Sequence, residues 1–390
     1  MIPFLDLAAD FAEVEADARR RIDGVLARQQ FVLGPETAAL EAAMRERLGA
    51  ASAVAVSSGS DALSLALLAL GIGPGDAVVV PAFTFFATAG AVARAGATPV
   101  FCDVDRGSFL AGAAEMRVAI ERGFRREGGA LRHVRDGSRL AALLPVHLYG
   151  RAVRMDGVLA LAAETGARVV EDAAQAIDSR DGGRAVGTIG DAGCFSFYPT
   201  KNLGGPGDGG LVACRDEALG ARLAGLRTHG AAPGGYLHEE AGVNARMAEL
   251  VAAVLVAKLA RLDAWNAARR RVAATYDEAL AGAASAGLLE LPSKPAPGGH
   301  AWHQYAVRIG GGRRDRVKAA LEAEGIPSRV FYPLPLHLQP CFASLGGAAG
   351  DLPESEAAAA EVLCLPIYPS LRDDDARRAA GALVRAARTA

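Results

Sequence analysis

The 390-residue sequence has few of the features that mark secreted, membrane-spanning or nucleic-acid-binding proteins. Its five cysteines are scattered and form no C-x-x-C pair, which indicates reduced thiols and argues against a disulfide framework or a zinc site. No apolar run is long enough to span a bilayer, and the N-terminal residues include early acids where a signal peptide has an apolar core. The formal net charge of -2 provides no basic surface field for nucleic acid or membranes. We therefore expect a cytoplasmic protein without a metal site.

What the sequence does contain is enough apolar material for a large core, because 51% of the residues are hydrophobic and 22% are charged. At this length the chain is expected to form two domains. Short apolar strands alternate with helices through the first half, which predicts a mostly parallel sheet with helices on both faces. The expected strands are 53–56, 77–80, 99–103, 140–146 and 167–170, and the expected helices include 11–30, 36–48, 62–70, 155–165 and 246–280.

The C-terminal part of the sequence has a different character. A Pro/Gly-rich connection at 292–299 precedes a strand at 303–309, a helix at 313–325 and a last helix from Asp373 onward. This mixture predicts a smaller α+β domain.

One stretch, from Asp191 to Val212, organises the rest of the chain: DAGCFSFYPTKNLGGPGDGGLV. It runs from an apolar segment into a polar turn that presents Lys201 between Pro199 and a run of glycines. Glycines allow conformations and close approaches that other residues do not, so this lysine is expected on irregular backbone and not on a helix face. Lys201 is then either a solvated loop charge, as most lysines are, or a reactive amine.

A strand, a small polar turn and a helix start follow one another around Ser57 to Asp61, in the sequence SSGSD. This order places free backbone N–H groups and hydroxyls at the positive end of a helix, which suits an anion such as phosphate. The alternative is an ordinary helix N-cap formed by Ser60 or Asp61.

Aromatic and acidic residues also follow strand ends, where α/β sheets bind their ligands. Phe83, Phe85 and Phe86 come after the second strand, and at least one of them is expected to pack in the core. Glu171 and Asp172 end an apolar strand, a position that is unfavourable for an acid unless it has a partner. The central histidines are expected to be buried with satisfied hydrogen bonds or to lie at an interface: His147, His300 and His303.

Together these groups form the set that pyridoxal phosphate chemistry requires. The lysine forms a Schiff base with the cofactor's aldehyde and later moves a proton. A carboxylate keeps the pyridine nitrogen protonated so that the ring accepts carbanion charge, and an aromatic plane stacks on the ring. Each group alone is a weak indication. Their occurrence in this order favours a cofactor-binding role for Lys201.

Longer motifs extend this pattern over nearly the whole chain. They are IPFLDL, FVLGPETAALE, SSGSDALSLAL, GPGDAVVVPAFTFFAT, GATPVFCDVD, LLPVHLYG, VVEDAAQA, FSFYPTKNLGGPGDGG, LRTHG, GVNARM, HQYAVRI and YPLPLHLQP. With these motifs the sequence resembles the DegT/DnrJ/EryC1/StrS family of nucleotide-sugar aminotransferases, within the fold type I (aspartate aminotransferase-like) enzymes. The resemblance implies a large α/β domain, 1–250, with a mostly parallel seven-stranded sheet that binds pyridoxal 5'-phosphate, and a smaller α+β domain, 251–390.

The resemblance also implies roles for individual residues. Lys201 would bond covalently to the cofactor, and Asp172 would pair with its pyridine nitrogen. Asn244 would reach the phosphate site of the neighbouring subunit, so the active site would lie at a homodimer interface. The remaining implied positions are Gln175 at the phenolic oxygen, Phe85 on the ring, Gly59, Ser60 and Ser196 at the phosphate, and His229 and Tyr332 near the substrate.

The expected reaction is the transfer of an amino group, with L-glutamate as the expected donor, to a keto sugar linked to a nucleoside diphosphate. Related sugar dehydratases carry histidine where this chain has Lys201, so lysine there implies transamination. The segment KNLGGPGDGG resembles enzymes that act on 3-keto sugars, whereas many 4-keto enzymes resemble a T-x-G-E-G-G pattern. The 3-keto sugar is therefore favoured. A 4-keto sugar or a cyclitol on the same fold remains an alternative.

Two rival functions are weighed from the residues. A nicotinamide-dependent oxidoreductase fits poorly, because a dinucleotide fingerprint should follow the first strand and open a helix. A catalytically silent regulator that binds a sugar nucleotide would not need Lys201, Asp172 and Gln175 together.

The sequence departs from the family pattern at three places. Ala248 and Val251 stand where the family often has R-M-D-E-L-Q, which bears on local dimer contacts. Phe331 replaces a common histidine before Tyr-Pro, which bears on the choice of sugar. Residues 121–139 form a longer, arginine-rich connection, read as a basic, partly flexible surface insertion. The alternative is that these arginines contact the nucleotide diphosphate.

Overall fold

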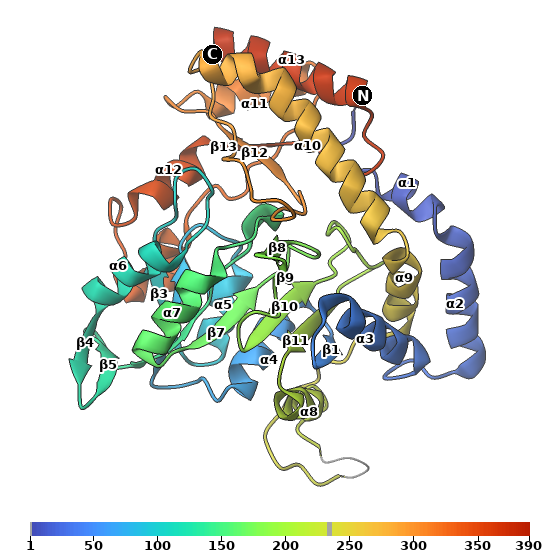
Figure 1. Cartoon of the computed structure of the whole chain (residues 1–390), viewed down its shortest axis with the longest axis vertical. Coiled ribbons are helices and arrows are strands. Elements are labelled where there is room, and N and C mark those ends of the chain that lie inside the picture. Colours follow the sequence, from blue (N-terminus) through green and yellow to red (C-terminus); the bar gives the residue numbers. More distant parts are fainter. Residues whose placement is uncertain (1, 232–235) are drawn as a thin grey trace.

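A computed structural model describes residues 2–231 and 236–390 of the chain. A central sheet forms the larger part of the molecule, and a group of helices around a short two-stranded sheet forms the smaller part (Figure 1). The central sheet has the strand order β1-β11-β10-β7-β6-β2-β3, and a hairpin, β4 and β5, branches from β6. The bounds are β1 Ser52–Val56, β2 Asp76–Pro81, β3 Thr98–Cys102, β4 Phe124–Glu127, β5 Ala130–His133, β6 Arg139–Leu143, β7 Arg168–Asp172, β10 Ala192–Ser196 and β11 Gly210–Cys214.

Along this path, neighbouring strands run parallel from β10 to β3, while β11 runs antiparallel to both of its neighbours. The hairpin strands also pair antiparallel, β4 with β5 and β5 with β6. The mostly parallel α/β sheet predicted from the sequence is therefore confirmed. The parallel strands have apolar middles with polar residues mainly at their ends, and all of β2 (DAVVVP) is buried. Such runs are typical of parallel sheets that helices cover on both faces.

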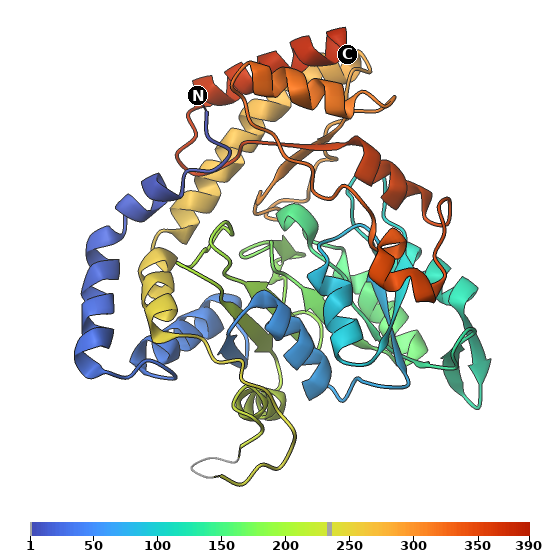
Figure 2. The ribbon, with the colours of Figure 1, turned by 180° about the vertical axis from the view of Figure 1, so that it is seen from behind.

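Helices cover the sheet on both faces. Figure 1 shows α6 and α7 on the near face, and Figure 2 shows α4 and α5 on the opposite face. The bounds in this part are α1 Leu7–Ala12, α2 Glu15–Arg28, α3 Pro35–Leu48, α4 Gly59–Ala69, α5 Ala87–Arg94, α6 Ala113–Gly123, α7 Met155–Thr165 and α8 Glu217–Leu226, with a 3-10 turn at Leu148–Gly150 and a small ladder of β8 Arg180–Asp181 and β9 Arg184–Ala185.

The smaller part has its own hydrophobic core, built around Tyr276, Leu321, Leu363 and Leu383. Its sheet is the antiparallel pair β12 and β13. The expected division at residues 250 and 251 stays a prediction. The remaining elements of the chain are α9 Glu249–Leu259, α10 Leu262–Ser285, β12 Tyr305–Arg308, α11 Arg314–Ala323, α12 Pro353–Glu361, β13 Val362–Leu365 and α13 Asp373–Thr389, with 3-10 turns at Leu336–Leu338 and Pro340–Leu345.

Three expected elements differ from those observed. The helix expected at 11–30 is two helices, α1 and α2, and the one expected at 246–280 is α9 followed by α10. The chain changes direction between α9 and α10, because α9 packs on α2 and α3 whereas α10 packs on α13. The prediction of a loop at 121–139 is wrong. This segment contains the end of α6 and the β4–β5 hairpin, which turns at Gly128 and Gly129, two glycines with positive φ. Within the described ranges, no helix has the length and apolar character needed to cross a membrane.

Candidate active site

A cavity of about 550 Å³ lies where β7 and β10 end and α4 begins. This is the carboxyl edge of the parallel strands, where α/β sheets bind ligands. The fold gathers most of the sequence-predicted site here from segments far apart in the chain. The predicted residues that line the cavity are Gly59, Ser60, Phe85, Asp172, Gln175, Ser196, Lys201 and Tyr332.

Lys201 is held in the turn that follows β10. Its backbone N–H donates to the Tyr198 carbonyl over 2.8 Å. The turn folds back so closely that a Cβ on Gly204 would lie 2.2 Å from the Pro199 carbonyl oxygen, so only glycine fits there. Burial lowers the pKa of Lys201 to about 8, although the nearby charge of Asp172 acts in the opposite direction. Among the described residues no carboxylate pairs with its amine within 4.0 Å.

Asp172 is a buried acid whose two oxygens both have partners. Thr88 Oγ1 donates to Oδ2 over 2.8 Å, and the Ala174 N–H donates to Oδ1 over 3.1 Å. Burial raises the pKa of Asp172, and these two hydrogen bonds oppose that rise. Sequence reasoning missed Thr88, whose hydroxyl also lies 3.2 Å from Thr84 Oγ1. The sequence feature that could have indicated Thr88 is the spacing of the two threonines in TFFAT, one helical turn apart.

Gln175 joins two parts of the cavity wall. Its Oε1 accepts from the Tyr149 N–H over 2.7 Å, and its Nε2 donates to the Tyr332 hydroxyl over 3.1 Å. The rings of Tyr332 and Phe85 lie with centroids 5.8 Å apart. Phe85 is 54% exposed while Phe83 is buried, so Phe83 is the core residue of the pair and Phe85 presents its ring to the cavity.

The start of α4 forms the expected anion turn, with one correction. Ser58, and not Ser60 or Asp61, is the N-cap: its side chain accepts from the Asp61 N–H. Ser60 is thereby left out of the cap and lines the cavity. Gly59 touches β10 so closely that a Cβ would lie 2.6 Å from the Ser196 Cβ. The first N–H groups of a helix have no intrahelical acceptor, so this cradle suits a phosphate.

These observations test whether the residues fit pyridoxal phosphate, and they do. A glycine-only cradle lies at a helix N-terminus, a half-buried amine has a lowered pKa, and a buried carboxylate lines the same cavity. A phosphate, an aldehyde and a pyridinium nitrogen need these three groups.

Glu171, the neighbour of Asp172, stabilises the fold and does not line the cavity. It is fully buried and accepts hydrogen bonds from the N–H groups of Gly187, Ile189 and Gly190. It also lies 3.0 Å from His147 Nε2, while the Val153 N–H donates to His147 Nδ1, so Nε2 carries the proton. Hydrogen bonds that favour the carboxylate lower the pKa of Glu171 against the opposing effect of burial.

The other central histidines are buried, as expected. His300 stacks on Trp302 with ring centroids 3.9 Å apart, and its Nδ1 accepts from the backbone N–H of Trp302. His303 lies 3.2 Å from Asn202 Oδ1 and, unexpectedly, lines the cavity. Burial and the Lys201 charge lower the pKa of His303 well below its usual range, so the ring is neutral.

Two predicted residues, Asn244 and His229, lie outside this cavity. Both are exposed, and they are neighbours: Asn244 bridges to Thr228, and the His229 N–H donates to the Val243 carbonyl over 3.0 Å. They belong to the segment that follows α8. Within one subunit the fold therefore does not bring them to Lys201.

Further lining residues carried no sequence prediction of a site role. Gln304 is 6% exposed, and its Oε1 has no hydrogen-bond partner in the described part of the chain. The sequence feature that could have indicated Gln304 is its position in the family-like motif HQYAVRI. The other lining residues of this kind are Tyr149, Tyr198 and Asp208.

Comparison with protein families gives one match over most of the chain. The model of the DegT/DnrJ/EryC1/StrS aminotransferase family matches residues 12–384. The chain is 44% identical to UDP-N-acetyl-3-dehydro-alpha-D-glucosamine 3-aminotransferase of Acidithiobacillus ferrooxidans, covering 98% of this chain and 97% of the relative. It is 41% identical to dTDP-3-amino-3,4,6-trideoxy-alpha-D-glucose transaminase of Streptomyces venezuelae (97% and 94%) and 41% identical to a pleiotropic regulatory protein of Geobacillus stearothermophilus (96% and 95%).

Solved structures agree with this match. The chain superimposes on DesV of S. venezuelae with a TM-score of 0.89 and 41% identity, covering 99% of this chain and 98% of that one. It also superimposes on NtdA of Bacillus subtilis, solved with bound cofactor PMP, with a TM-score of 0.87 and 28% identity over 98% and 85% of the two chains. The α/β architecture inferred above is therefore that of known sugar aminotransferases.

Proposed function

This chain belongs to the DegT/DnrJ/EryC1/StrS aminotransferase family, and we propose that it transfers an amino group from L-glutamate to a nucleoside-diphosphate-linked 3-keto sugar. The observation that carries the proposal is the placement of Lys201 and Asp172 in one cavity beside the N-terminus of α4. A silent binding protein would have no need for an amine with a lowered pKa in such a site.

The cofactor is pyridoxal 5'-phosphate, which supplies an aldehyde for covalent attachment and a ring that accepts negative charge. In our proposal the amine of Lys201 would hold the cofactor covalently, and the carboxylate of Asp172 would pair with its ring nitrogen. The proposed supporting contacts are Gly59, Ser60 and Ser196 at the phosphate, Phe85 against the ring and Gln175 at the phenolic oxygen.

The chain's own groups then move the protons. Lys201 Nζ, with its pKa lowered to about 8, exists partly as a neutral amine near neutral pH and can take the proton from Cα of the amino donor. In the second half of the reaction it returns a proton to the sugar carbon that receives nitrogen. Thr88 and the Ala174 N–H stabilise the charged form of Asp172, which the reaction requires in a buried site. Two successive half-reactions predict ping-pong kinetics.

The choice of a 3-keto sugar rests on two supports. The segment KNLGGPGDGG, which contributes Lys201 and Asp208 to the cavity, resembles that of 3-keto enzymes. Relatives at 44% and 41% identity are named as a 3-aminotransferase and a 3-amino-sugar transaminase. A 4-keto sugar or cyclitol acceptor is the alternative within the same reaction.

We also propose that the enzyme works as a homodimer. Asn244 and His229 are exposed neighbours that lie outside their own subunit's cavity, which supports a role for both in the cavity of a partner subunit. Asn244 would then contact the partner's phosphate site, and His229 would lie near the partner's substrate.

One observation favours a second function. A relative covering 96% of this chain at 41% identity is named a pleiotropic regulatory protein. A protein of the same fold could bind a sugar nucleotide without converting it. The same experiment decides between the two functions.

The experiment is the absorption spectrum of the purified holoenzyme before and after addition of L-glutamate. We expect a yellow band that bleaches with glutamate and returns only with a nucleotide-linked 3-keto sugar, and not with the matched 4-keto sugar. A Lys201→Ala variant should lack the band. A band that glutamate leaves unchanged would overturn the assigned donor, and no band after loading with pyridoxal phosphate would favour the regulatory function.

A further inference from the structure

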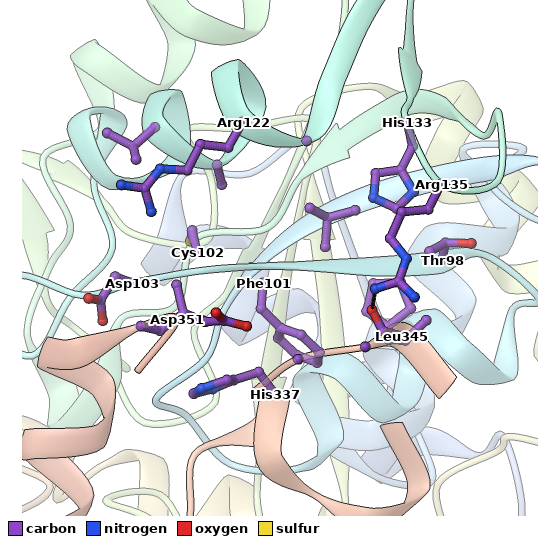
Figure 3. A pocket seen from close by; sticks show the side chains of 18 of the residues that line it. Thr98, Phe101, Cys102, Asp103, Arg122, His133, Arg135, His337, Leu345 and Asp351 are labelled. Atoms are coloured by element: carbon purple, nitrogen blue, oxygen red, sulfur yellow. Dashed lines mark hydrogen bonds between the residues drawn. The ribbon is translucent and has the colours of Figure 1, made fainter. Parts of the chain in front are cut away.

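A second cavity, of about 810 Å³, lies at the far edge of the central sheet (Figure 3). Its walls come from β3, from α6, from the end of the β4–β5 hairpin and from the C-terminal segment 337–353. It shares no lining residue with the cavity of Lys201. Nothing in the proposed aminotransferase reaction uses it.

The middle of this second cavity is apolar. Val100 and Phe101 of β3 form one side, and Val118 and Ala119 of α6 face it. The Phe101 ring packs edge-on against Phe342 with centroids 5.5 Å apart, so the aromatic floor is fixed. A volume of this size with an apolar lining is typical of a site for a small organic molecule.

Four acids line the cavity, and each accepts hydrogen bonds within the fold: Asp103, Glu115, Asp136 and Asp351. Glu115 accepts from the Gly112 N–H, and Asp351 accepts from the Ala348 N–H. Asp103 accepts from the N–H groups of Glu354 and Ser355 and thereby caps α12. Asp136 accepts from the hydroxyl of Thr98. These carboxylates keep their charge, but these donors of the protein itself hold their oxygens.

Together, the two arginines that line the cavity make fewer hydrogen bonds and ion pairs than the four acids do. In the described part of the chain, Arg122 makes no hydrogen bond or ion pair, and Arg135 uses only Nη1, which donates to the Leu345 carbonyl. Figure 3 shows Arg122 toward the Asp103 end of the cavity and Arg135 toward the Leu345 end.

A buried histidine supplies an independent observation. His337 lines the cavity and is 3% exposed, with Nε2 lying 3.1 Å from Glu356 Oε1. Its Nδ1 is buried and has no partner in the described residues. Buried polar atoms without partners are rare in folded proteins, so this nitrogen distinguishes the histidine beside the cavity.

We propose that this second cavity binds a small organic anion: a flat apolar body that fills the space between β3 and α6, with a carboxylate, sulfonate or phosphate held by Arg122 and Arg135. An apolar interior gives the body its binding energy, and guanidinium groups at the rim bind such oxyanions by charge-assisted hydrogen bonds. The site would serve an effector and not the substrate, because it is separate from the Lys201 cavity.

The test uses the holoenzyme loaded with pyridoxal phosphate and two fluorescent probes of nearly the same shape. One is the anion 8-anilinonaphthalene-1-sulfonate, and the other is its uncharged analogue N-phenyl-1-naphthylamine. The variants are Arg122→Gln, which loses no contact seen in the fold, and Val118→Glu, which places a negative charge at a half-exposed position in the wall. The matched control is Arg125→Gln, an exposed arginine in the adjoining strand β4 that does not line the cavity.

We expect Arg122→Gln to raise the Kd of the anionic probe about tenfold and to leave the Kd of the neutral probe unchanged, since one charge-assisted contact is lost. Val118→Glu should abolish binding of the anion, and Arg125→Gln should have no effect. The proposal is overturned if the control weakens the anion as much as Arg122→Gln does, or if uridine diphosphate displaces the probe, which would place it in the catalytic cavity. It is also overturned if Val118→Glu changes the oligomeric state in sedimentation velocity, because the cavity would then be an interface between copies.

Discussion

At the scale of single residues, the reactivity expected of Lys201 depends on residues that are remote from it in the sequence. The glycine run after it correctly predicted irregular backbone, yet the pattern left open a solvated charge. The decision comes from Asp172, Ser60 and Tyr332, which reach the same cavity from other strands and loops. Their packing removes water from the amine and lowers its pKa. No spacing in the sequence contains that information.

The lowered pKa of Lys201 predicts how fast the apoenzyme takes up its cofactor. Only the neutral amine attacks an aldehyde, so the attachment rate should rise as the pH increases through the pKa. With a pKa moved from 10.5 to about 8, the rate should level off above pH 9 and have its midpoint near 8. Stopped-flow absorbance after mixing apoenzyme with pyridoxal phosphate, between pH 6.5 and pH 10.5, measures this.

Asp172 provides the control for that measurement. Its charge raises the pKa of Lys201 against the effect of burial. In Asp172→Asn the midpoint should therefore move to lower pH. A midpoint near 10.5 in the wild type would show that the amine is solvated after all.

The two acids at the end of β7 show the limit of residue-level reasoning. The sequence indicates that Glu171 and Asp172 need partners, and both have them. It does not indicate that the hydrogen-bond partners of Glu171 differ from those of Asp172. Glu171 is bound by N–H groups of the segment before β10, whereas Asp172 is bound by Thr88 and faces the cavity. Only the direction of each side chain from the strand separates the structural acid from the site acid.

At the scale of elements, the start of α3 was predicted from Gly34-Pro35, but its cap was not. The carboxylate of Glu249, at the start of α9, accepts from the N–H groups of Gly34, Glu36 and Thr37. A residue remote in sequence therefore performs the task that a local serine or aspartate usually performs. Such a cap joins two helices, which sequence patterns within one helix do not reveal.

Replacing Glu249 should destabilise the fold by an amount that depends on pH. The variant Glu249→Gln loses charge-assisted bonds in a buried site, and we expect a loss of about 2 kcal/mol in the free energy of unfolding at pH 7.5. The hydrogen bonds lower the pKa of Glu249 in the folded state. Its contribution is therefore complete above the unfolded pKa and is lost as the pH falls through the folded pKa.

Urea denaturation at pH 7.5 and at acid pH measures both effects. The difference between wild type and Glu249→Gln should shrink in acid. Glu46→Gln, an exposed position on α3, is the matched control and should change the unfolding midpoint little. Equal effects of the two variants at pH 7.5 would contradict the proposed cap.

The arginine-rich segment 121–139 shows how composition alone misleads. Its glycines and charges are typical of a loop, yet Gly128 and Gly129 turn a regular hairpin. The hairpin joins the sheet through Arg132 and Arg139, at the N-terminal end of β6. The Lys201 cavity lies at the opposite, C-terminal ends of the strands. This placement favours a surface insertion over contacts of these arginines with a nucleotide diphosphate in the same subunit.

At the scale of the whole molecule, alternation of strands and helices predicted a mostly parallel sheet but not its order. The order β1-β11-β10-β7-β6-β2-β3 places the start of α4 beside the end of β10. A Cβ on Gly210 would lie 2.3 Å from the Ser58 carbonyl oxygen, so the first and the late strands meet without space for a side chain. Strand order follows from such long-range packing, and that is why the cavity could be predicted as a list of residues but not as a shape.

The proposed homodimer makes a prediction that no single subunit can test. If Asn244 completes the partner's cavity, a dimer of one Lys201→Ala subunit and one Asn244→Ala subunit contains one intact site and one doubly altered site. We expect each homodimer to be nearly inactive and the heterodimer to have about half the activity of the wild-type dimer, because the two sites of a symmetric dimer are equivalent.

Heterodimers can be isolated by co-expression with two different affinity tags and assayed for release of 2-oxoglutarate. Recovered activity would mean that residues outside one subunit's cavity act in the other, as the exposed position of Asn244 and His229 suggests. A heterodimer as inactive as both homodimers would contradict a shared site, since Lys201 and Asn244 would then have to act within the same subunit. That result would require the segment after α8 to move toward the cavity of its own subunit.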